Sequence, residues 1–390
     1  MNICIISPFP FYAPPYNLGT INSWWKELSY KHNIYVISPF PCEKIHRVMI
    51  NDTNITEFRV PAYEMKQIPC MIPYFNGMLK TITYINRKYG LDLLHSIKTV
   101  FPSSLYSLLF SKHLKIPLIS SIHGMYQYFE SPFIKLFFSL YTFTITQKIL
   151  MESKKIIIFS PKMSLFIKKF KVPNEKIEVV PFGPDLNKFR PKNKIESRKK
   201  LNLPLDKFIV LFTGRMARIK GVEFLLKASS IIAKQSDNNN MYFIFAGMGP
   251  MRINLMNKAN KIDGISFLFP GYVNNVEDYL AASDILVLPS LSEGLPMSLL
   301  EAQAMEIPVI ASNVGSISDV IIDGKNGLLI ESKNEKSLAN SINILYNNVE
   351  LRKSMGIKGR RQILTKFNSS LISEKIEEIY INVVCAQESI

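Results

Sequence analysis

The sequence predicts an α/β protein made of two doubly wound domains, each built around a mainly parallel sheet. The chain has 390 residues, more than one hydrophobic core usually serves, so two domains are the first expectation. Its composition, 47% hydrophobic and 20% charged, is that of a globular protein rather than a disordered one. Short β-branched runs also alternate with longer stretches of helical periodicity, which is typical of parallel sheets covered by helices.

Each predicted strand is a short, nearly continuous apolar run. The first series comprises residues 2–7, 33–38, 91–97, 117–122, 155–160 and 177–181. The second series comprises residues 208–214, 241–247, 265–271, 285–289, 309–312 and 327–330. Two such series predict two doubly wound domains that face a cleft, with ligands at the carboxyl ends of the strands.

A polar stretch marks the join between the two series. Residues 187–194 are polar and charged, so we place the linker near residues 184–200. The expected domains are residues 1–183 and 184–368. The remaining segment, 369–390, has the apolar spacing of a helix, and we expect it to return to the N-terminal domain.

Cysteine usage and hydropathy predict a cytoplasmic location. None of the cysteines forms a Cys-x-x-Cys pair; they are Cys4, Cys42, Cys70 and Cys385. This pattern argues against a zinc site or a disulfide framework and fits a reducing compartment. The N-terminus enters an apolar run without a basic lead, so no secretory signal is expected. The most hydrophobic later stretch, residues 133–151, is interrupted by Lys135 and Lys148, whereas a bilayer span needs about 20 apolar residues.

The net charge of +16 is concentrated in the first half of the chain. Residues 1–180 carry 21 Lys or Arg and 10 Asp or Glu, a net charge of +11. A basic half with many aromatic side chains suits an anionic partner, either a membrane surface or a nucleic acid. Solvated surface charge would explain the same composition equally well.

Three strand ends in the second half carry candidate binding residues. Arg215 and Lys220 lie in one strand-to-helix loop, where a planar guanidinium and a point-like ammonium can reach the same anion. Residues 247–250, Gly-Met-Gly-Pro, lack the third glycine of a dinucleotide-binding fingerprint, and we expect a tight turn without ligand contact. At Tyr272 and Val273, backbone groups could bond to the edge of a base and a side chain could stack on its face, although a plain strand end remains an alternative.

The next loop carries two carboxylates, Glu293 and Glu301, with seven residues between them. The loop precedes a helix expected to begin near Pro296 or Met297, and free amides at a helix start point towards an anion. A single Glu near a helix start more often only stabilises the helix dipole. Two carboxylates that flank such a loop instead suggest hydrogen bonds to vicinal hydroxyls, from Glu293 to a sugar and from Glu301 to a ribose.

The first half offers two weaker candidates. Gly19 lies in the long loop after the first strand, where the backbone could approach a phosphate closely. His123 stands at the tip of a predicted strand and on the same cleft, so we interpret it as functional although a lone His is more often structural. No Asp-x-Asp occurs in the chain, so a carboxylate-bound metal is not expected. Arg215, Lys220 and helix amides would then have to neutralise the leaving group.

Together these residues resemble the retaining glycosyltransferases of family 4, which have the GT-B fold of two Rossmann-like domains. The resemblance extends from about residue 177 to residue 367 and is looser in the first half, where it rests on His123-Gly124 and the Gly19 loop. Its motifs are PFGPDLNKF at 181–189, GR…KG at 214–221, AGMGP at 246–250, and then GYV, YLAASDILVLPS, EGLPMSLLEAQA, PVIAS and DGKNGLLI. The spaced Glu293 and Glu301 match the paired-glutamate motif of this family.

The resemblance implies a hexosyltransferase-like enzyme that acts without a metal or a further cofactor. A nucleoside diphosphate sugar would sit between an acceptor-side N-terminal domain and a donor-binding C-terminal domain. Arg215 and Lys220 would hold its diphosphate, Glu301 its ribose and Glu293 its sugar. His123 would contact the donor sugar and help to position the reacting centre. Further contacts would come from Gly19, Tyr272, Val273, Gly294, Leu295, Pro296 and Met297. The anomeric configuration would be kept by same-face attack, with the departing phosphate assisting deprotonation of the acceptor and without an enzyme nucleophile.

The expected substrates and partners follow from the same resemblance. The donor would be a UDP-sugar, or else a GDP-sugar, and the acceptor a glycan or a lipid-linked molecule; no nucleic acid is expected. A basic aromatic segment could lie on an anionic membrane at its cytoplasmic face, or equally be a buried core helix. Its aromatic and basic residues are Tyr126, Tyr128, Phe129, Phe133, Lys135, Phe137, Phe138, Tyr141, Phe143 and Lys148.

Two departures from the family pattern leave other functions open. The first loop offers one glycine, Gly19, where the family often has two, and Pro184 removes an amide donor where the family has Gly-Val-Asp. The alternatives are a nucleotide-sugar epimerase on the same two-domain plan, a nucleic-acid-binding protein that uses the basic half, and an inactive sugar-nucleotide sensor.

Overall fold

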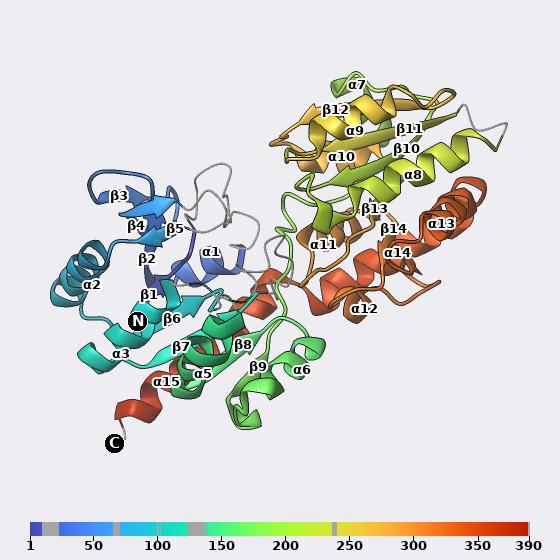
Figure 1. The fold of residues 1–390 in the computed structure, drawn as a ribbon. Coiled ribbons are helices and arrows are strands. Elements are labelled where there is room, and N and C mark those ends of the chain that lie inside the picture. Colours follow the sequence, from blue (N-terminus) through green and yellow to red (C-terminus); the bar gives the residue numbers. More distant parts are fainter. Residues whose placement is uncertain are drawn as a thin grey trace. The chain divides into compact units, whose positions relative to one another are not determined.

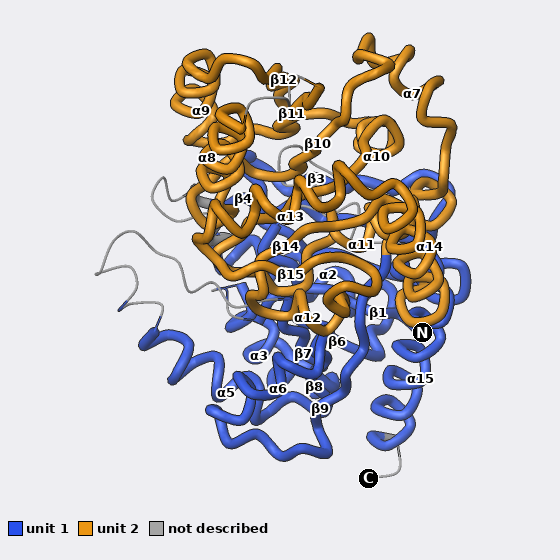
Figure 2. Tube along the Cα trace, turned by 90° about the vertical axis from the view of Figure 1, so that its right-hand side faces the viewer, with its two compact units in different colours: residues 1–183, 369–390 blue, residues 184–368 orange. Residues whose placement is uncertain are grey.

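The chain folds into two compact units. A computed structural model describes residues 1–9, 23–64, 71–99, 101, 103–123, 136, 139–235 and 240–388. Unit 1 comprises Met1–Gly183 and Ser369–Ile390, and unit 2 comprises Pro184–Asn368 (Figure 2). Each unit has its own largely parallel sheet with helices packed against it (Figure 1), which confirms the predicted doubly wound α/β architecture.

Unit 2 contains a six-stranded parallel sheet in the order β12-β11-β10-β13-β14-β15. Its strands are β10 (Phe208–Thr213), β11 (Met241–Ala246), β12 (Ser266–Gly271), β13 (Ile285–Leu288), β14 (Val309–Ser312) and β15 (Leu328–Ile330). Every residue of β10 and β13 is buried, because both faces of the sheet are covered by helices. Counted along the chain, the strand order is 3-2-1-4-5-6, so the order reverses between β10 and β13.

The helices of unit 2 follow its strands in the alternation that the sequence predicts. They are α7 (Lys194–Lys200), α8 (Val222–Ala233), α9 (Arg252–Ala259), α10 (Val276–Ala282), α11 (Met297–Ala304), α12 (Ile317–Val320), α13 (Glu335–Asn347) and α14 (Val349–Lys366). The core includes Phe212, Phe243 and Val287 from the strands, packed with Leu225 of α8 and Leu338 of α13.

Part of the segment that we expected to be a linker is a helix of unit 2. The side chain of Asn193 caps α7 by accepting hydrogen bonds from two backbone amides. Arg198 of α7 is buried; its guanidinium donates to the carbonyl of Ala282 at 2.9 Å and pairs with Asp284 at 2.8 Å. The charges of this stretch therefore bind the segment to α10 and β13, which a count of polar residues cannot distinguish from solvation.

The larger sheet of unit 1 has the order β3-β4-β2-β1-β6-β7-β8-β9, with β5 paired to β4. Its strands are β1 (Asn2–Ile6), β2 (Asn33–Phe40), β3 (His46–Met49), β4 (Ile55–Glu64), β5 (Met71–Pro73), β6 (Leu93–Ile97), β7 (Leu118–Ile122), β8 (Lys155–Ile158) and β9 (Ile177–Val179). All pairings are parallel except those of β3 and β5 with β4. The sequence did not predict β3, β4 or β5, because β4 contains Pro61 and a completely buried Glu57 whose carboxylate accepts from Ser38 at 2.8 Å.

The described helices of unit 1 vary more in length and are partly irregular. They are α1 (Ser23–Ser29), α2 (Phe75–Tyr89), α3 (Ser103–Leu114), α5 (Gln147–Glu152), α6 (Ser164–Ile167) and α15 (Ser369–Glu388), with a π-helical turn at Thr142–Thr146 before α5. Within the described ranges, no helix combines the length and apolar character that crossing a bilayer requires.

The last helix, α15, belongs to unit 1 although unit 2 precedes it in the chain. Its Tyr380 is fully buried, and its hydroxyl lies 2.5 Å from Nδ1 of His95 in β6. Glu377 of the same helix contacts Lys31 at 2.7 Å and His32 at 3.0 Å, just beyond α1. The chain therefore leaves unit 1 once and returns to it at the end.

Candidate functional site

The reversal of strand order in unit 2 marks where a ligand would bind. In open α/β sheets, ligands bind outside the carboxyl ends of the strands at the point where the order reverses. In unit 2 this point lies between β10 and β13, which pair directly through Val210 and Leu211. The loop after β10 carries Arg215 and Lys220, and the loop after β13 carries Glu293, so the structure brings these predicted residues to one edge of the sheet.

A glycine holds these two loops together. Gly221 has φ +61°, a left-handed conformation, and a Cβ atom there would lie 1.8 Å from the carbonyl oxygen of Pro289. The amide of Leu291 also donates to the carbonyl of Ile219 at 2.8 Å. The backbone therefore fixes the loop after β10 against the loop after β13, and only glycine fits at the contact.

Lys220 and Glu293 form an ion pair at this contact. Nζ of Lys220 donates to Oε1 of Glu293 at 2.6 Å, and Oγ of Ser290 donates to the same oxygen at 2.7 Å. The Glu293 side chain is 7% exposed and the Lys220 side chain 30% exposed. An ammonium group has three hydrogens, so Lys220 can keep this bond and still donate to a bound anion.

The other side of the Glu293 loop is fixed by the segment after β14. Gly315 has φ +56°, and a Cβ atom there would lie 1.8 Å from the carbonyl oxygen of Glu293. The amide of Ser316 donates to the carbonyl of Gly294 at 3.2 Å. The loop is thus held on both sides before it enters α11 at Met297.

Helix α11 begins where the sequence predicts. Pro296 precedes it in an extended conformation, and no side chain caps its first amides. Glu301 lies in its second turn and is 6% exposed. The pKa of Glu301 is raised to about 7, chiefly by burial; Lys188 lowers it and Glu277 adds a smaller increase. A carboxyl group with this pKa is close to half protonated at neutral pH, so it can both donate and accept hydrogen bonds with a diol.

Arg215 remains apart from the ion pair in the described structure. Its side chain is exposed, and it makes no hydrogen bond or ion pair with the described residues. The loop that carries it packs on residues 247–250: Gly247 has φ +142°, and a Cβ atom there would lie 1.9 Å from the carbonyl oxygen of Gly214. The Gly-Met-Gly-Pro glycines therefore serve loop packing, as a tight turn should.

The end of β12 offers an exposed ring beside this packed turn. The carbonyl of Gly271 accepts from the amide of Gly247 at 2.7 Å. The next residue, Tyr272, is 50% exposed, and Val273 is partly buried. The arrangement leaves an aromatic face at a strand end of unit 2, where we predicted contact with a base.

His123 lies directly after β7 in unit 1. Its Nε2 is 3.0 Å from Oγ of Ser121, and its ring packs edge-to-face on Phe159 at 4.4 Å. Burial lowers the pKa of His123 well below its ordinary value, with smaller contributions from Lys98 and His95, so the ring is neutral. Its Nδ1 is buried and has no partner among the described residues.

Some predicted residues lie outside the described part of the chain. These are Gly19 and, in the basic aromatic segment, Tyr126, Tyr128, Phe129, Phe133, Lys135, Phe137 and Phe138. Of the described members of that segment, Tyr141 is buried, with its hydroxyl donating to Phe101 at 3.0 Å, and Phe143 is 50% exposed.

The structure also places near the strand ends of both units several residues that were not predicted from the sequence. Ser290 is the second residue after β13 and orients Glu293, while Glu277 and Lys188 influence Glu301 from other segments of unit 2. Lys98 directly follows β6 and lies close enough to His123 to lower its pKa. Position immediately after a predicted strand is the signal that could have found Ser290 and Lys98.

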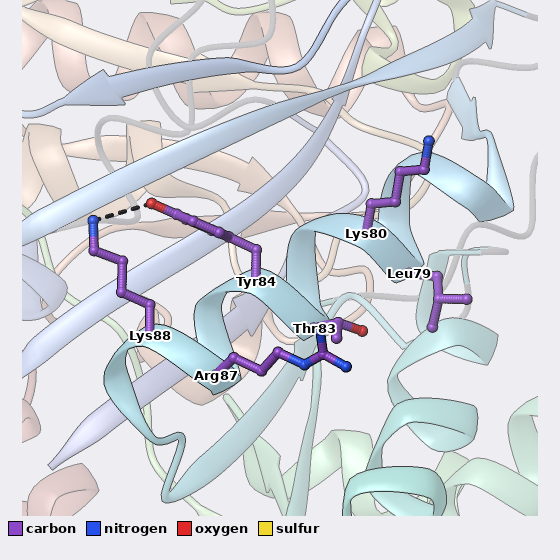
Figure 3. Close-up of a pocket in the computed structure, with 6 residues that line it drawn as sticks. All are labelled: Leu79, Lys80, Thr83, Tyr84, Arg87 and Lys88. Carbon is purple, nitrogen blue, oxygen red and sulfur yellow. Dashed lines mark hydrogen bonds between the residues drawn. The ribbon is translucent and has the colours of Figure 1, made fainter.

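Unit 1 also has an open pocket of about 580 Å³ on the exposed face of α2. Its lining is basic and aromatic (Figure 3) and consists of Leu79, Lys80, Thr83, Tyr84, Arg87 and Lys88. Nζ of Lys88 donates to the hydroxyl of Tyr84 at 3.1 Å. All six residues lie on one face of α2.

Comparisons with known proteins place the chain in a family. Residues 193–362 match the model of glycosyl transferases group 1, and residues 26–188 match that of glycosyltransferase family 4. An uncharacterized glycosyltransferase of Methanocaldococcus jannaschii is 30% identical over 79% of this chain and 80% of that protein. The glycosyltransferase TuaC of Bacillus subtilis, named for teichuronic acid biosynthesis, is 29% identical over 80% of this chain and 79% of that protein. Other matches are partial: D-inositol 3-phosphate glycosyltransferase of Paenarthrobacter aurescens is 32% identical over 47% of this chain, and the match spans 46% of that protein.

Solved structures agree with this family at the level of the fold. Sucrose-phosphate synthase from Thermosynechococcus elongatus has a TM-score of 0.79 at 20% identity, covering 99% of both chains. HepE from Anabaena, solved with UDP-glucose, has a TM-score of 0.76 at 16% identity, covering 98% of this chain and 100% of that chain. The chain therefore belongs to glycosyltransferase family 4 and has the GT-B fold of two Rossmann-like units.

Proposed function

We propose that this glycosyltransferase moves a sugar from a nucleoside diphosphate sugar to a hydroxyl group of a glycan or lipid-linked acceptor, with retention of the anomeric configuration. The observation that carries the proposal is the ion pair of Lys220 and Glu293 at the point of reversal in unit 2, beside the uncapped start of α11. A cation, free helix amides and two carboxylates suit a ligand that combines an anion with polyols.

The donor would be held by its diphosphate. Lys220 would keep one hydrogen on Glu293 and turn the others to the phosphate, with Arg215 and the segment Gly294–Met297 beside it. Charge-assisted bonds of this kind stabilise the negative charge that grows on the leaving phosphate. Because the sequence contains no Asp-x-Asp, we propose that these groups neutralise the leaving group without a metal ion.

The rings of the donor would be oriented by the two carboxylates. Glu301, with a pKa near 7, would bond to the ribose diol, and Glu293 would bond to the donor sugar. Tyr272 and Val273 would contact the base, and Gly19 would approach the diphosphate. The neutral His123 would contact the donor sugar and help to position the reacting centre. In the reaction the acceptor oxygen bonds to the anomeric carbon, the bond from that carbon to phosphate breaks, and the acceptor proton passes to the departing phosphate.

Two similar proteins support this choice of substrates. HepE is solved with UDP-glucose, and an Escherichia coli relative, 29% identical over 60% of this chain, is named as a transferase from UDP-Gal to a diphosphoundecaprenol-linked sugar. We therefore propose a UDP-sugar as donor, with a GDP-sugar as the alternative.

A thermal-shift screen with UDP-, GDP- and ADP-sugars tests the donor site. A nucleotide at 100 times its dissociation constant stabilises its site by about 2.7 kcal/mol. One class should raise Tm without added Mg²⁺, and Glu301→Ala should weaken that response. Product NMR with the responding donor then shows whether the anomeric configuration is kept; an isomerised nucleotide sugar without an acceptor would point to the epimerase instead. Silence from every nucleotide would contradict the proposal.

We also propose that the enzyme works as a peripheral protein on an anionic membrane. The support is the α2 face of Figure 3, which carries Lys80, Arg87 and Lys88 together with the exposed Tyr84, whose ring lies beside Lys88. Basic and aromatic side chains on one helix face suit an anionic lipid surface. Co-sedimentation with vesicles containing phosphatidylglycerol should fall in a variant with all three cations replaced by Gln, and vesicles of phosphatidylcholine alone should bind neither protein. Equal binding of both proteins would refute this assignment.

A further inference from the structure

Unit 1 has its own point of strand reversal, close to which His123 was predicted from the sequence and Lys98 was not. Counted along the chain, the parallel strands β1, β2 and β4 extend to one side, and β6, β7, β8 and β9 extend to the other. The order therefore reverses between β1 and β6, which pair directly. Lys98 directly follows β6, and His123 directly follows the neighbouring β7. The rule that locates the donor site in unit 2 thus points to these two residues in unit 1.

Lys98 carries a charge without a counter-charge. Its Nζ lies 4.7 Å from the ring centroid of Phe9, which follows β1, and it makes no ion pair or hydrogen bond with any described residue. Burial lowers the pKa of Lys98 to about 8, so the side chain is still mostly protonated at neutral pH. Its surface remains partly exposed, which leaves it open to a ligand.

The backbone conformation of Lys98 also opposes folding. Lys98 has φ +53°, in the left-handed region that residues other than glycine rarely adopt. An unpaired buried cation and a left-handed backbone both oppose folding, and strain of this kind collects at binding sites. A bound anion would pair with the Lys98 cation and offset these two unfavourable contributions.

The groups around Lys98 do not supply that anion. The titratable groups that couple to this cluster in the described structure are His123 and His95, both neutral because burial lowers their pKa values. His123 has Nε2 on Ser121 and a buried Nδ1 without a described partner. In unit 1 the acidic side chains outside the described structure are those of Glu64, Glu130 and Glu388, and of these Glu130 lies nearest in sequence to His123.

We infer that Lys98 and His123 form an oxyanion subsite at the carboxyl ends of β6 and β7, which binds a phosphate or carboxylate group of a substrate. Lys98 supplies the charge and the neutral imidazole of His123 a hydrogen bond, a combination that suits an oxyanion. The assignment of the anion to a substrate rests on the proposed function. It predicts that the acceptor is anionic close to its reacting hydroxyl, or else that the subsite takes a donor phosphate.

Inorganic phosphate is the probe that tests the subsite independently of transfer. We would follow the Cε1–Hε1 signals of ¹³C-labelled histidine, assigning the signal of His123 with His123→Asn. Phosphate should shift this signal with saturation in the unmodified protein. Lys98→Met should weaken the binding at least about tenfold, since a charged hydrogen bond is worth about 1.5–3 kcal/mol. Lys115→Met is the matched control, because Lys115 is an exposed lysine of unit 1 with φ +56°, and it should leave the titration unchanged.

Stability provides a second readout. Without phosphate, Lys98→Met should raise Tm, because it removes an unpaired cation, and phosphate should no longer raise Tm in this variant. If Lys98→Met and Glu130→Gln both lower Tm, the cation has an internal partner and the inference is overturned. An unshifted His123 signal, or the same shift in Lys98→Met, would overturn it as well.

Kinetics then identify the source of the anion. With an active donor and acceptor pair, Lys98→Met should raise KM for the acceptor and leave KM for the donor near its normal value. An increase in KM for the donor alone would assign the subsite to the donor diphosphate. If no nucleotide sugar binds at all, the proposed function fails, but the phosphate titration still decides whether the subsite exists.

Discussion

The ion pair of Lys220 and Glu293 allows the most direct test of the donor site, through Lys220→Met. The pair joins Nζ and Oε1 at 2.6 Å, with Glu293 7% exposed and Lys220 30% exposed. Hydrogen bonds to charged groups contribute a net stabilisation of about 1.5–3 kcal/mol, and solvent at Lys220 places this one near the lower end. Removing Lys220 should therefore lower the free energy of unfolding by about 1–2 kcal/mol. Glu293→Gln should cost less, because the amide can still accept from Ser290.

Urea denaturation with and without UDP separates stability from binding. The double variant Lys220→Met/Glu293→Gln should recover about 1 kcal/mol relative to Lys220→Met, since it leaves no unpaired charge, yet neither protein should be stabilised by UDP. Lys227→Met is the matched control: its ion pair with Glu335 is 3.9 Å long and exposed, so the change should cost less than about 0.5 kcal/mol and keep the response to UDP. A Lys220→Met protein that UDP stabilises as strongly as the unmodified one would refute the donor site.

Three further predictions concern the same unit. The folded pKa of Glu301, about 7, lies above its unfolded value, so the folded state loses stability as pH rises from about 4.5 through 7. Glu301→Gln should abolish this loss. In urea titrations the variant should be up to about 3 kcal/mol more stable than the unmodified protein at pH 8, but not at pH 4. Gly221→Ala places a Cβ atom 1.8 Å from a backbone oxygen, so it should lower the free energy of unfolding by at least about 2 kcal/mol and abolish nucleotide binding. In the control Gly324→Ala, with φ +72° and no atom within 4 Å, the free energy of unfolding should fall by about 1 kcal/mol and binding should stay intact. Equal losses in the two variants would contradict the loop contact. Arg198→Met leaves a buried carboxylate with fewer partners and should lower the free energy of unfolding by about 2–4 kcal/mol without changing nucleotide affinity, which urea denaturation and titration calorimetry can check.

The sequence predicted the twelve strands that carry the two parallel sheets. Most of these strands are buried on both faces, so they are short apolar runs that stand out from the helices; β9, β12 and β15 are only partly buried. The three strands that it missed lie at one edge of unit 1, where the pattern differs: β4 contains Pro61 and buries Glu57, whose charge is balanced by Arg59 at 3.1 Å. Such a strand looks polar until its partners are known.

The candidate site was predicted unevenly, for a similar reason. Arg215, Lys220 and Glu293 were found because they lie in loops between clear strands and helices, and the structure adds that two of them bond to each other. Lys98 was missed because a single lysine in a basic half of the chain has no distinguishing neighbours in sequence. That Lys98 has no counter-charge among the described residues can be recognised only once the fold places β1, β6 and β7 side by side.

The return of α15 to unit 1 has a consequence for biosynthesis. A ribosome releases the chain from its N-terminus at about 5–20 residues per second. Unit 2 is one continuous segment and can complete its core as soon as Asn368 has emerged, but the indole of Trp25 and the imidazole of His95 await Tyr380, which is made after all of unit 2. Unit 1, whose synthesis begins first, therefore completes its core after unit 2. A nascent chain stalled before residue 369 would expose the hydrophobic surface that α15 covers, where chaperones bind.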